Sequence, residues 1–157
     1  MPDVSVTWLG HAAFRIDSPS GKRIYVDPWL DNPKCPENEQ KPERADIVAL
    51  THGHSDHVGS TVEIAKEFSP EIVALVELKG WLGDQGAEVG EMPGPNKGGT
   101  VEIDGIGFTI VNAFHSGSTP DGPARLCGAL TDRQGTRLST GMKRVRFSYA
   151  PPIQALA

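Results

Sequence analysis

The stretch Thr51-His52-Gly53-His54-Ser55-Asp56-His57 contains three of the five histidines of this 157-residue chain. Imidazole and carboxylate side chains in one short run suit a borderline divalent ion such as zinc. The apolar segment 45–50 before the run predicts a buried strand, and Ser-Thr-Val-Glu at 60–63 predicts a capping box that opens a helix. The run therefore lies on a strand-to-helix turn, where side chains converge and still meet solvent. A His-rich surface loop is the alternative, but the aspartate at a ligand position favours metal binding.

The composition is that of one ordinary globular domain. Hydrophobic residues make up 38% and charged residues 22% of the chain, and the length predicts a single domain with a sizeable core. No apolar run approaches the roughly 20 residues of a membrane span, and the N-terminus lacks a secretory pattern, so we expect a cytoplasmic protein without a membrane partner. Cys35 and Cys127 form no close pair, which favours free thiols. The net charge of −5 argues against a nucleic-acid partner.

Apolar alternation and turn signals predict strands first and strand–helix units after them. Val4, Val6 and Trp8 alternate with polar neighbours and predict a half-buried strand, the first of an antiparallel meander that ends at Asp27. The other expected elements are strands at 14–16 and 23–26, an exposed loop at 31–44, strands at 47–50 and 72–75, helices at about 61–68 and 78–85, a hairpin of 100–103 with 107–111, and a second hairpin of 126–130 with 136–138. Beyond Gly141 there is no helical pattern and no clear strand pair. This order predicts an α/β layered domain.

Three candidate ligand groups follow predicted strands: Asp27, the 52–57 cluster and His115. Because open α/β sheets place their sites beyond the carboxyl ends of strands, we expect these groups to meet. A metal-bound imidazole needs a partner on its other ring nitrogen, and Asp27 is the natural candidate. Asp56 has the chemistry either to bind metal or to accept a proton. His11 either lines the pocket or bonds the neighbouring backbone.

Five motifs, in order along the chain, carry a resemblance to a known family. They are Trp-Leu-Gly-His-Ala at 8–12, Asp-Pro-Trp-Leu at 27–30, the 51–57 run, Asn-Lys-Gly-Gly-Thr at 96–100 and Ala-Phe-His-Ser at 113–116. Together they resemble the metallo-β-lactamase superfamily, and within it the bacterial metal-dependent hydrolase branch related to ascorbate-phosphate lactonase. The resemblance runs from about Val4 to about Leu138.

The resemblance implies an αββα sandwich with a one- or two-metal site between the sheets. It implies a first metal bound by His52, His54 and His115 and a second metal bound by Asp56 and His57. It also implies that Asp27 is a carboxylate that orients the ligands and that His11 lies beside them. Zinc is the expected ion, with manganese as the alternative. The implied activity is hydrolysis of a small ester, lactone or phosphorylated substrate by a zinc-activated water, with Asp56 as catalytic carboxylate. Zinc lowers the pKa of bound water from 15.7 to about 7, so this chemistry is available at neutral pH.

The sequence departs from the family pattern near residue 138. The resemblance requires a Gly-Asp-Thr motif there, whose aspartate bridges both metals, and a later histidine; neither follows Leu138. Residues 133–157 also hold five basic side chains and no acidic one, although the whole chain has 15 basic and 20 acidic residues. We therefore predict a metallo-β-lactamase-like domain at 1–138, with its second half incomplete, and an atypical basic tail at 139–157, either disordered or frameshifted.

Two origins of the tail remain open. A shifted reading frame on a truncated domain is the first, and translating the coding DNA in the other two frames past codon 138 tests it. If neither frame yields Gly-Asp-Thr, the frame hypothesis is wrong. A natural shortened variant is the second, and it leaves an apolar sheet face uncovered. Three functions remain open as well: a hydrolase, a catalytically impaired metal-binding fragment and a non-enzymatic interaction module. Each of them is compatible with a homo-oligomer.

Overall fold

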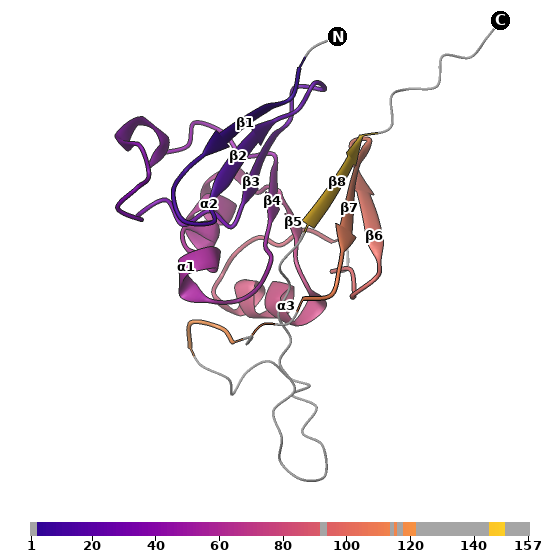
Figure 1. The fold of residues 1–157 in the computed structure, drawn as a ribbon. Helices are drawn as coiled ribbons and strands as arrows, with labels where there is room; N and C mark the ends of the chain where they lie inside the picture. Colours follow the sequence, from indigo (N-terminus) through magenta and orange to yellow (C-terminus); the bar gives the residue numbers. More distant parts are fainter. Residues whose placement is uncertain (1–2, 92–93, 114, 116–117, 122–144, 150–157) are drawn as a thin grey trace, which may run out of the picture.

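Five strands form a mixed sheet in the order β1-β2-β3-β4-β5 (Figure 1). The strands are β1 (Ser5–Trp8), β2 (Phe14–Asp17), β3 (Arg23–Val26), β4 (Ile47–Ala49) and β5 (Glu71–Val73). The first three pair antiparallel, as the predicted meander requires, and β4 and β5 continue the sheet in parallel. The computed structural model describes residues 3–91, 94–113, 115, 118–121 and, for the backbone, 145–149.

Short helices connect the strands after β3. They are η1 (Glu37–Glu39), α1 (Ser55–Val58), α2 (Thr61–Phe68) and α3 (Val76–Asp84). The helix predicted at 61–68 is confirmed, but the capping box is wrong: Ser60 is the N-cap residue without a side-chain cap bond. Its hydroxyl instead accepts the Leu30 N–H at 3.2 Å, because the chain after β3 passes this helix end. None of the helices in the described residues is long and apolar enough to cross a bilayer.

A second sheet contains β6 (Thr100–Ile103), β7 (Ile106–Ile110) and β8 (Val145–Tyr149), all antiparallel. The predicted hairpin is confirmed, with Asp104 at φ 50° and Gly105 at φ 77° in its tight turn. Beyond Gly141 the sequence showed no clear strand pair, but the backbone of 145–149 forms one strand there, and it pairs with β7. Its residues, Val-Arg-Phe-Ser-Tyr, alternate with the period of a strand. The second predicted hairpin, Cys127 and the rest of the tail lie outside the described residues.

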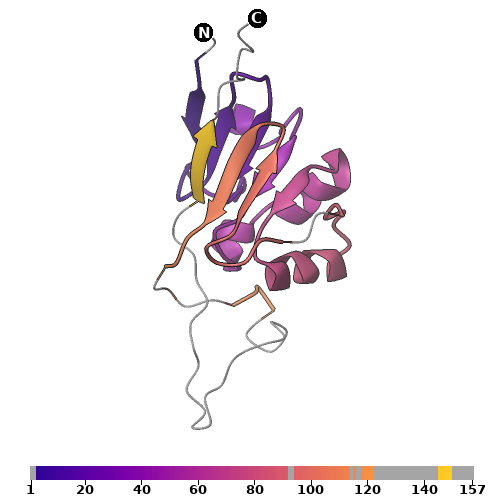
Figure 2. The same ribbon diagram turned by 90° about the vertical axis from the view of Figure 1, so that its right-hand side faces the viewer.

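Alternating side chains of the first sheet build two apolar layers. Tyr25 and Val48 belong to a core shared with the helices, to which all three α-helices of the described residues contribute. Their strand neighbours Ile24 and Ile47 point the other way and pack with Phe108 of the second sheet. Figure 2 shows β6–β8 in front of the first sheet. The described residues thus have an α/β/β layering, which agrees with the predicted α/β class.

The first strand lies outside the second layer. Val4, Val6 and Trp8 are 55%, 60% and 54% exposed, so the expectation of a half-buried strand is wrong for this face. Phe14 and Ile16 on the neighbouring strand do pack into the layer between the sheets. The second sheet therefore covers the first from β2 onward but leaves the apolar stripe on β1 in contact with solvent.

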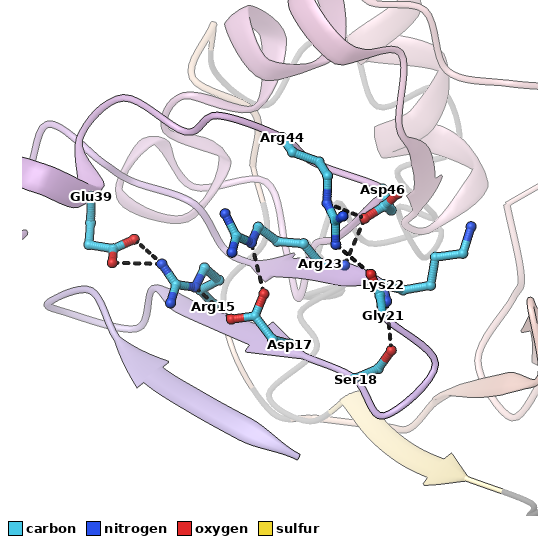
Figure 3. A network of polar contacts seen from close by, with 9 residues as sticks. All are labelled: Arg15, Asp17, Ser18, Gly21, Lys22, Arg23, Glu39, Arg44 and Asp46. Atoms are coloured by element: carbon cyan, nitrogen blue, oxygen red, sulfur yellow. Dashed lines mark hydrogen bonds and ion pairs between the residues drawn. The ribbon is translucent and has the colours of Figure 1, made fainter. Parts of the chain in front are cut away.

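An ion-pair network lies on β2 and β3 (Figure 3). The Arg15 guanidinium donates to both carboxylate oxygens of Glu39, at 2.6 and 2.5 Å, and ties η1 to the sheet. Asp17 accepts from Arg15 and Arg23. Burial raises the pKa of Asp17, but the hydrogen bonds and charges of the two arginines outweigh it, and the pKa is lowered overall.

Candidate metal centre

The candidate ligands gather at one end of the layered sheets. Asp27 follows β3, the 52–57 run follows β4, and His115 lies beyond the end of β7. The parallel pairing of β3 with β4 brings the first two to the same sheet edge. The sequence-based expectation that the three groups meet is therefore confirmed in space.

Three histidines form what we call the inner group: His52, His54 and His115. Their ligand atoms all lie within 4.8 Å of one another. The Nε2 of His52 and the Nδ1 of His54 are 2.9 Å apart. Two nitrogens on one tetrahedral zinc are separated by about 3.3 Å, given Zn–N bonds of about 2.0–2.1 Å. The His52 and His54 nitrogens thus fit one zinc ion after a shift of a few tenths of an ångström, and the His115 donor atom lies within 4.8 Å of both.

Asp27 orients two of the histidines, His57 directly and His52 through Thr51. Its side chain is buried and accepts the Thr51 N–H at 2.7 Å, the Thr51 hydroxyl at 2.5 Å and His57 Nδ1 at 2.7 Å. Because the Thr51 hydroxyl donates to Asp27, its oxygen accepts from His52 Nδ1, which lies 3.0 Å away. Both imidazoles are therefore held through Nδ1, and Nε2 remains for a metal. Thr51 was missed as a functional residue, although it stands inside the motif.

The outer group contains His11, Asp56 and His57, whose ligand atoms again lie within 4.8 Å of one another. His11 Nε2 is 3.1 Å from Asp56 Oδ2, and both side chains are 42% exposed. The His11 and His57 ring centroids are 5.2 Å apart. Of the two readings of His11, the pocket-lining one matches this geometry. The ligand atoms of Asp27, His52 and His57 also lie within 4.8 Å of one another, but Asp27 already accepts three hydrogen bonds.

A tight turn fixes the backbone of His11. Gly10 has φ 90° and His11 has φ 47°, and the Trp8 indole donates to the His11 carbonyl at 3.0 Å. A Cβ at Gly10 would lie 2.1 Å from Asn32 Oδ1. Asn32 is buried and donates to the Leu9 and Trp29 carbonyls. The expectation of an exposed loop at 31–44 is therefore wrong at this residue, whose amide supports the turn.

Close packing also fixes the inner group. A Cβ at Gly53 would lie 2.3 Å from the Ser118 carbonyl oxygen, so the segment beyond His115 rests directly on the turn between the two cluster histidines. The Trp81 indole of α3 donates to Asp121 at 2.9 Å and anchors the same segment. The His52–His115 and His54–His115 ring centroids lie 4.7 and 5.0 Å apart.

Electrostatics suit metal binding in both groups. Burial, followed by the charges of the neighbouring histidines, lowers the pKa of His52 to about 3. This imidazole is therefore neutral at pH 7, which is the form that binds metal. Partial burial raises the pKa of Asp56, but its own backbone N–H and the nearby histidines outweigh this and hold the pKa below its ordinary value. Asp56 is an ionised carboxylate at neutral pH.

Comparison with known proteins places the site in a family. The family described as the beta-lactamase superfamily domain matches residues 5–136. This chain belongs to the beta-lactamase superfamily. The match includes every candidate ligand and ends close to residue 138, where the resemblance was expected to stop. It does not include 139–157, and the reading-frame hypothesis for that tail stays a prediction.

Relatives within the superfamily are named as metal-dependent hydrolases. A UPF0173 metal-dependent hydrolase from Koribacter versatilis is 46% identical over 121 residues, which cover 76% of this chain and 51% of the relative. Another from Brucella anthropi is 45% identical over 130 residues, covering 80% and 54%. Igni18, a metallo hydrolase from the archaeon Ignicoccus hospitalis, superimposes with a TM-score of 0.64 at 30% identity, covering 73% and 50%. The chain spans about half the length of the relatives it matches.

Proposed function

We propose that this chain is a metal-dependent hydrolase that acts on a small ester, lactone or phosphorylated substrate. The observation that carries the proposal is the convergence of His52, His54 and His115, with ligand atoms within 4.8 Å of one another. The names of the superfamily relatives support the hydrolase class. Zinc fits an all-imidazole donor set, and manganese is the alternative.

The residues around the inner group have different roles in the proposed reaction. A zinc ion bound there supplies a Lewis acid for a carbonyl or phosphoryl oxygen and lowers the pKa of water to about 7. Asp27 and Thr51 hold His52 with Nε2 toward the ion position. Asp56 stands at the solvent side of the site, and its carboxylate accepts the proton that water releases as it attacks the substrate.

Metal content and hydrolysis test the proposal together. The purified chain is expected to contain zinc or manganese by elemental analysis and to hydrolyse simple aryl esters, lactones or phosphodiesters. His54→Ala and His115→Ala should lose both the inner ion and turnover, because each removes one of three ligands. Arg15→Ala is the matched control, since its ion pair with Glu39 lies in the separate network on β2. Wild-type metal content in His54→Ala would contradict the proposal.

A metal-binding chain without turnover is the second candidate. The three inner imidazoles are sufficient to bind an ion, whereas His11 and Asp56 on the solvent side are each 42% exposed and less constrained. Bound metal with no hydrolysis of any of the three substrate classes would favour this candidate. Turnover that follows metal content across the ligand variants would exclude it.

A further inference from the structure

The outer strand of the first sheet combines an open edge with exposed apolar side chains (Figure 1). In the part of the chain that the structure describes, β1 has one sheet neighbour, β2, and residues 5–8 make no backbone–backbone hydrogen bond outside that pairing. Val4, Val6 and Trp8 are each more than half exposed. We propose that this edge pairs with the same edge of a second copy of the chain, antiparallel across a two-fold axis.

The composition of β1 lacks the features that usually keep an exposed edge from pairing. Such edges commonly carry lysine, proline or a bulge. Residues 5–8 read Ser-Val-Thr-Trp, without charge or proline, and their register with β2 is continuous from Ser5 opposite Asp17 to Trp8 opposite Phe14. Valine, threonine and tryptophan are also favoured in strands. The edge is therefore suited to accept a further strand.

The residue order of β1 is complementary to itself when the strand is reversed. Val4, Val6 and Trp8 share one face because side chains alternate along a strand. With Val6 opposite the Val6 of the second copy, Val4 lies opposite Trp8 on both sides of the axis. Ser5 then lies opposite Thr7 on the other face. Aromatic–β-branched and hydroxyl pairs of this kind stabilise antiparallel strands, so the strand fits the self-complementary interface that a two-fold axis requires.

Pairing also changes the surroundings of the apolar stripe, which the second sheet of the same chain leaves in contact with solvent. In the dimer the stripes of the two copies adjoin, and each Trp8 packs beside the Val4 of the other copy. Trp8 donates its indole N–H to the His11 carbonyl at 3.0 Å, so the interface lies next to the outer group of each copy. Because a single strand pair buries a small area, we expect a dimer that dissociates on dilution.

Sedimentation equilibrium of the full-length chain over a range of concentrations provides the test. We expect twice the chain mass of 16.8 kDa at high concentration. Val6→Lys and Val6→Glu should each be monomeric, because position 6 faces itself across the axis and like charges repel. An equimolar mixture of the two variants should restore the dimer, since lysine then faces glutamate. Val76→Lys is the matched control, because this valine is 44% exposed on α3 and should leave the dimer unchanged.

Three results would overturn the inference. An unmodified chain that stays monomeric up to its solubility limit would refute the dimer. Unchanged dimerisation of Val6→Lys would show that the copies meet through another surface. Val6 is 60% exposed, so both variants should keep the circular dichroism of the unmodified chain, and failure of their mixture to dimerise would refute the two-fold register. Metal content and hydrolysis do not enter these measurements, so the proposed function is tested separately.

Discussion

The inner group consists of three imidazoles and the outer group of two imidazoles and a carboxylate, and the two groups differ in the burial of their first members, His52 and His11. His52 of the inner group is buried, and its Nδ1 is engaged by Thr51. His11 and Asp56 of the outer group are each 42% exposed. Burial lowers the pKa of His52 and keeps this imidazole neutral, whereas the exposed side chains of His11 and Asp56 are accessible to solvent. The inner group therefore includes one buried, neutral donor, whereas two donors of the outer group meet solvent.

Their support comes from different parts of the chain. The inner group is fixed by contacts between strand ends and the segment at 118–121. The outer group depends on the Gly10–His11 turn and on Asn32 behind it. Asp27 supports both groups, through the Thr51 hydroxyl for the inner group and through His57 for the outer group. Substitutions can therefore damage both groups, one group alone, or neither.

Asp27→Ala should damage both groups and give the largest effect. It removes the acceptor of the Thr51 N–H, the Thr51 hydroxyl and His57 Nδ1. Since each orphaned buried donor costs about 1–3 kcal/mol, we expect the free energy of unfolding to fall by more than about 3 kcal/mol. Urea denaturation measures this loss. Asp27→Asn keeps the side-chain shape and tolerates φ 45°, so it should fold, with metal affinity about 10–100-fold weaker. Wild-type stability in Asp27→Ala would contradict the shared role of this carboxylate.

Gly53→Ala and Gly10→Ala should each damage one group. A Cβ at Gly53 would collide with the Ser118 carbonyl and displace the segment next to His115. A Cβ at Gly10 would collide with Asn32 and displace His11. Each substitution should destabilise the fold by about 1–3 kcal/mol through overpacking. Metal analysis should show loss of the inner ion in Gly53→Ala and its retention in Gly10→Ala. An identical metal content in the two variants would show that the groups are not independently supported.

Acid should destabilise the metal-free protein through His52. Its pKa is about 3 in the folded chain against 6.5 ordinarily, so the unfolded chain binds one more proton between these values. The free energy of unfolding therefore rises with pH across this window, by at most about 1.4 kcal/mol per pH unit, and this contribution is complete above pH 6.5. Thermal melts of chelator-treated protein from pH 4 to pH 8, compared with His52→Gln, isolate the effect. An unchanged pH profile in His52→Gln would contradict it.

Elements defined by local signals were predicted well from sequence. The helix at 61–68 follows from its apolar face, and the Asp104-Gly105 hairpin follows from residues that tolerate positive φ. The ligand run is local as well, so His52, His54, Asp56 and His57 stand out without a structure. The strand β8 also has a local signal, the alternation at 145–149, which was overlooked.

Features that depend on distant segments were not predictable in this way. The Asp27–Thr51 bonds join residues 24 positions apart, and the Asn32–Leu9 bond spans 23 positions. No local residue pattern identifies a hydrogen-bond partner that is so far away in the sequence. The exposure of Val6 and Trp8 has the same origin: alternation predicts an apolar face, but the extent of the opposite sheet decides whether the face is covered.

Arg15→Ala should leave both groups intact and give the smallest effect. Arg15 and Glu39 are partly exposed, with side chains 19% and 13% accessible, and their ion pair lies in the network on β2 and β3 (Figure 3). Partly exposed ion pairs contribute about 0.5–1 kcal/mol, so urea denaturation should show a loss of that size. Zinc stoichiometry should remain that of the unmodified chain, because no ligand or orienting residue contacts Arg15 in the network. A changed stoichiometry would mean that metal binding depends on the stability of the whole first sheet, and the contrast between the two groups would then reflect global stability instead of local support.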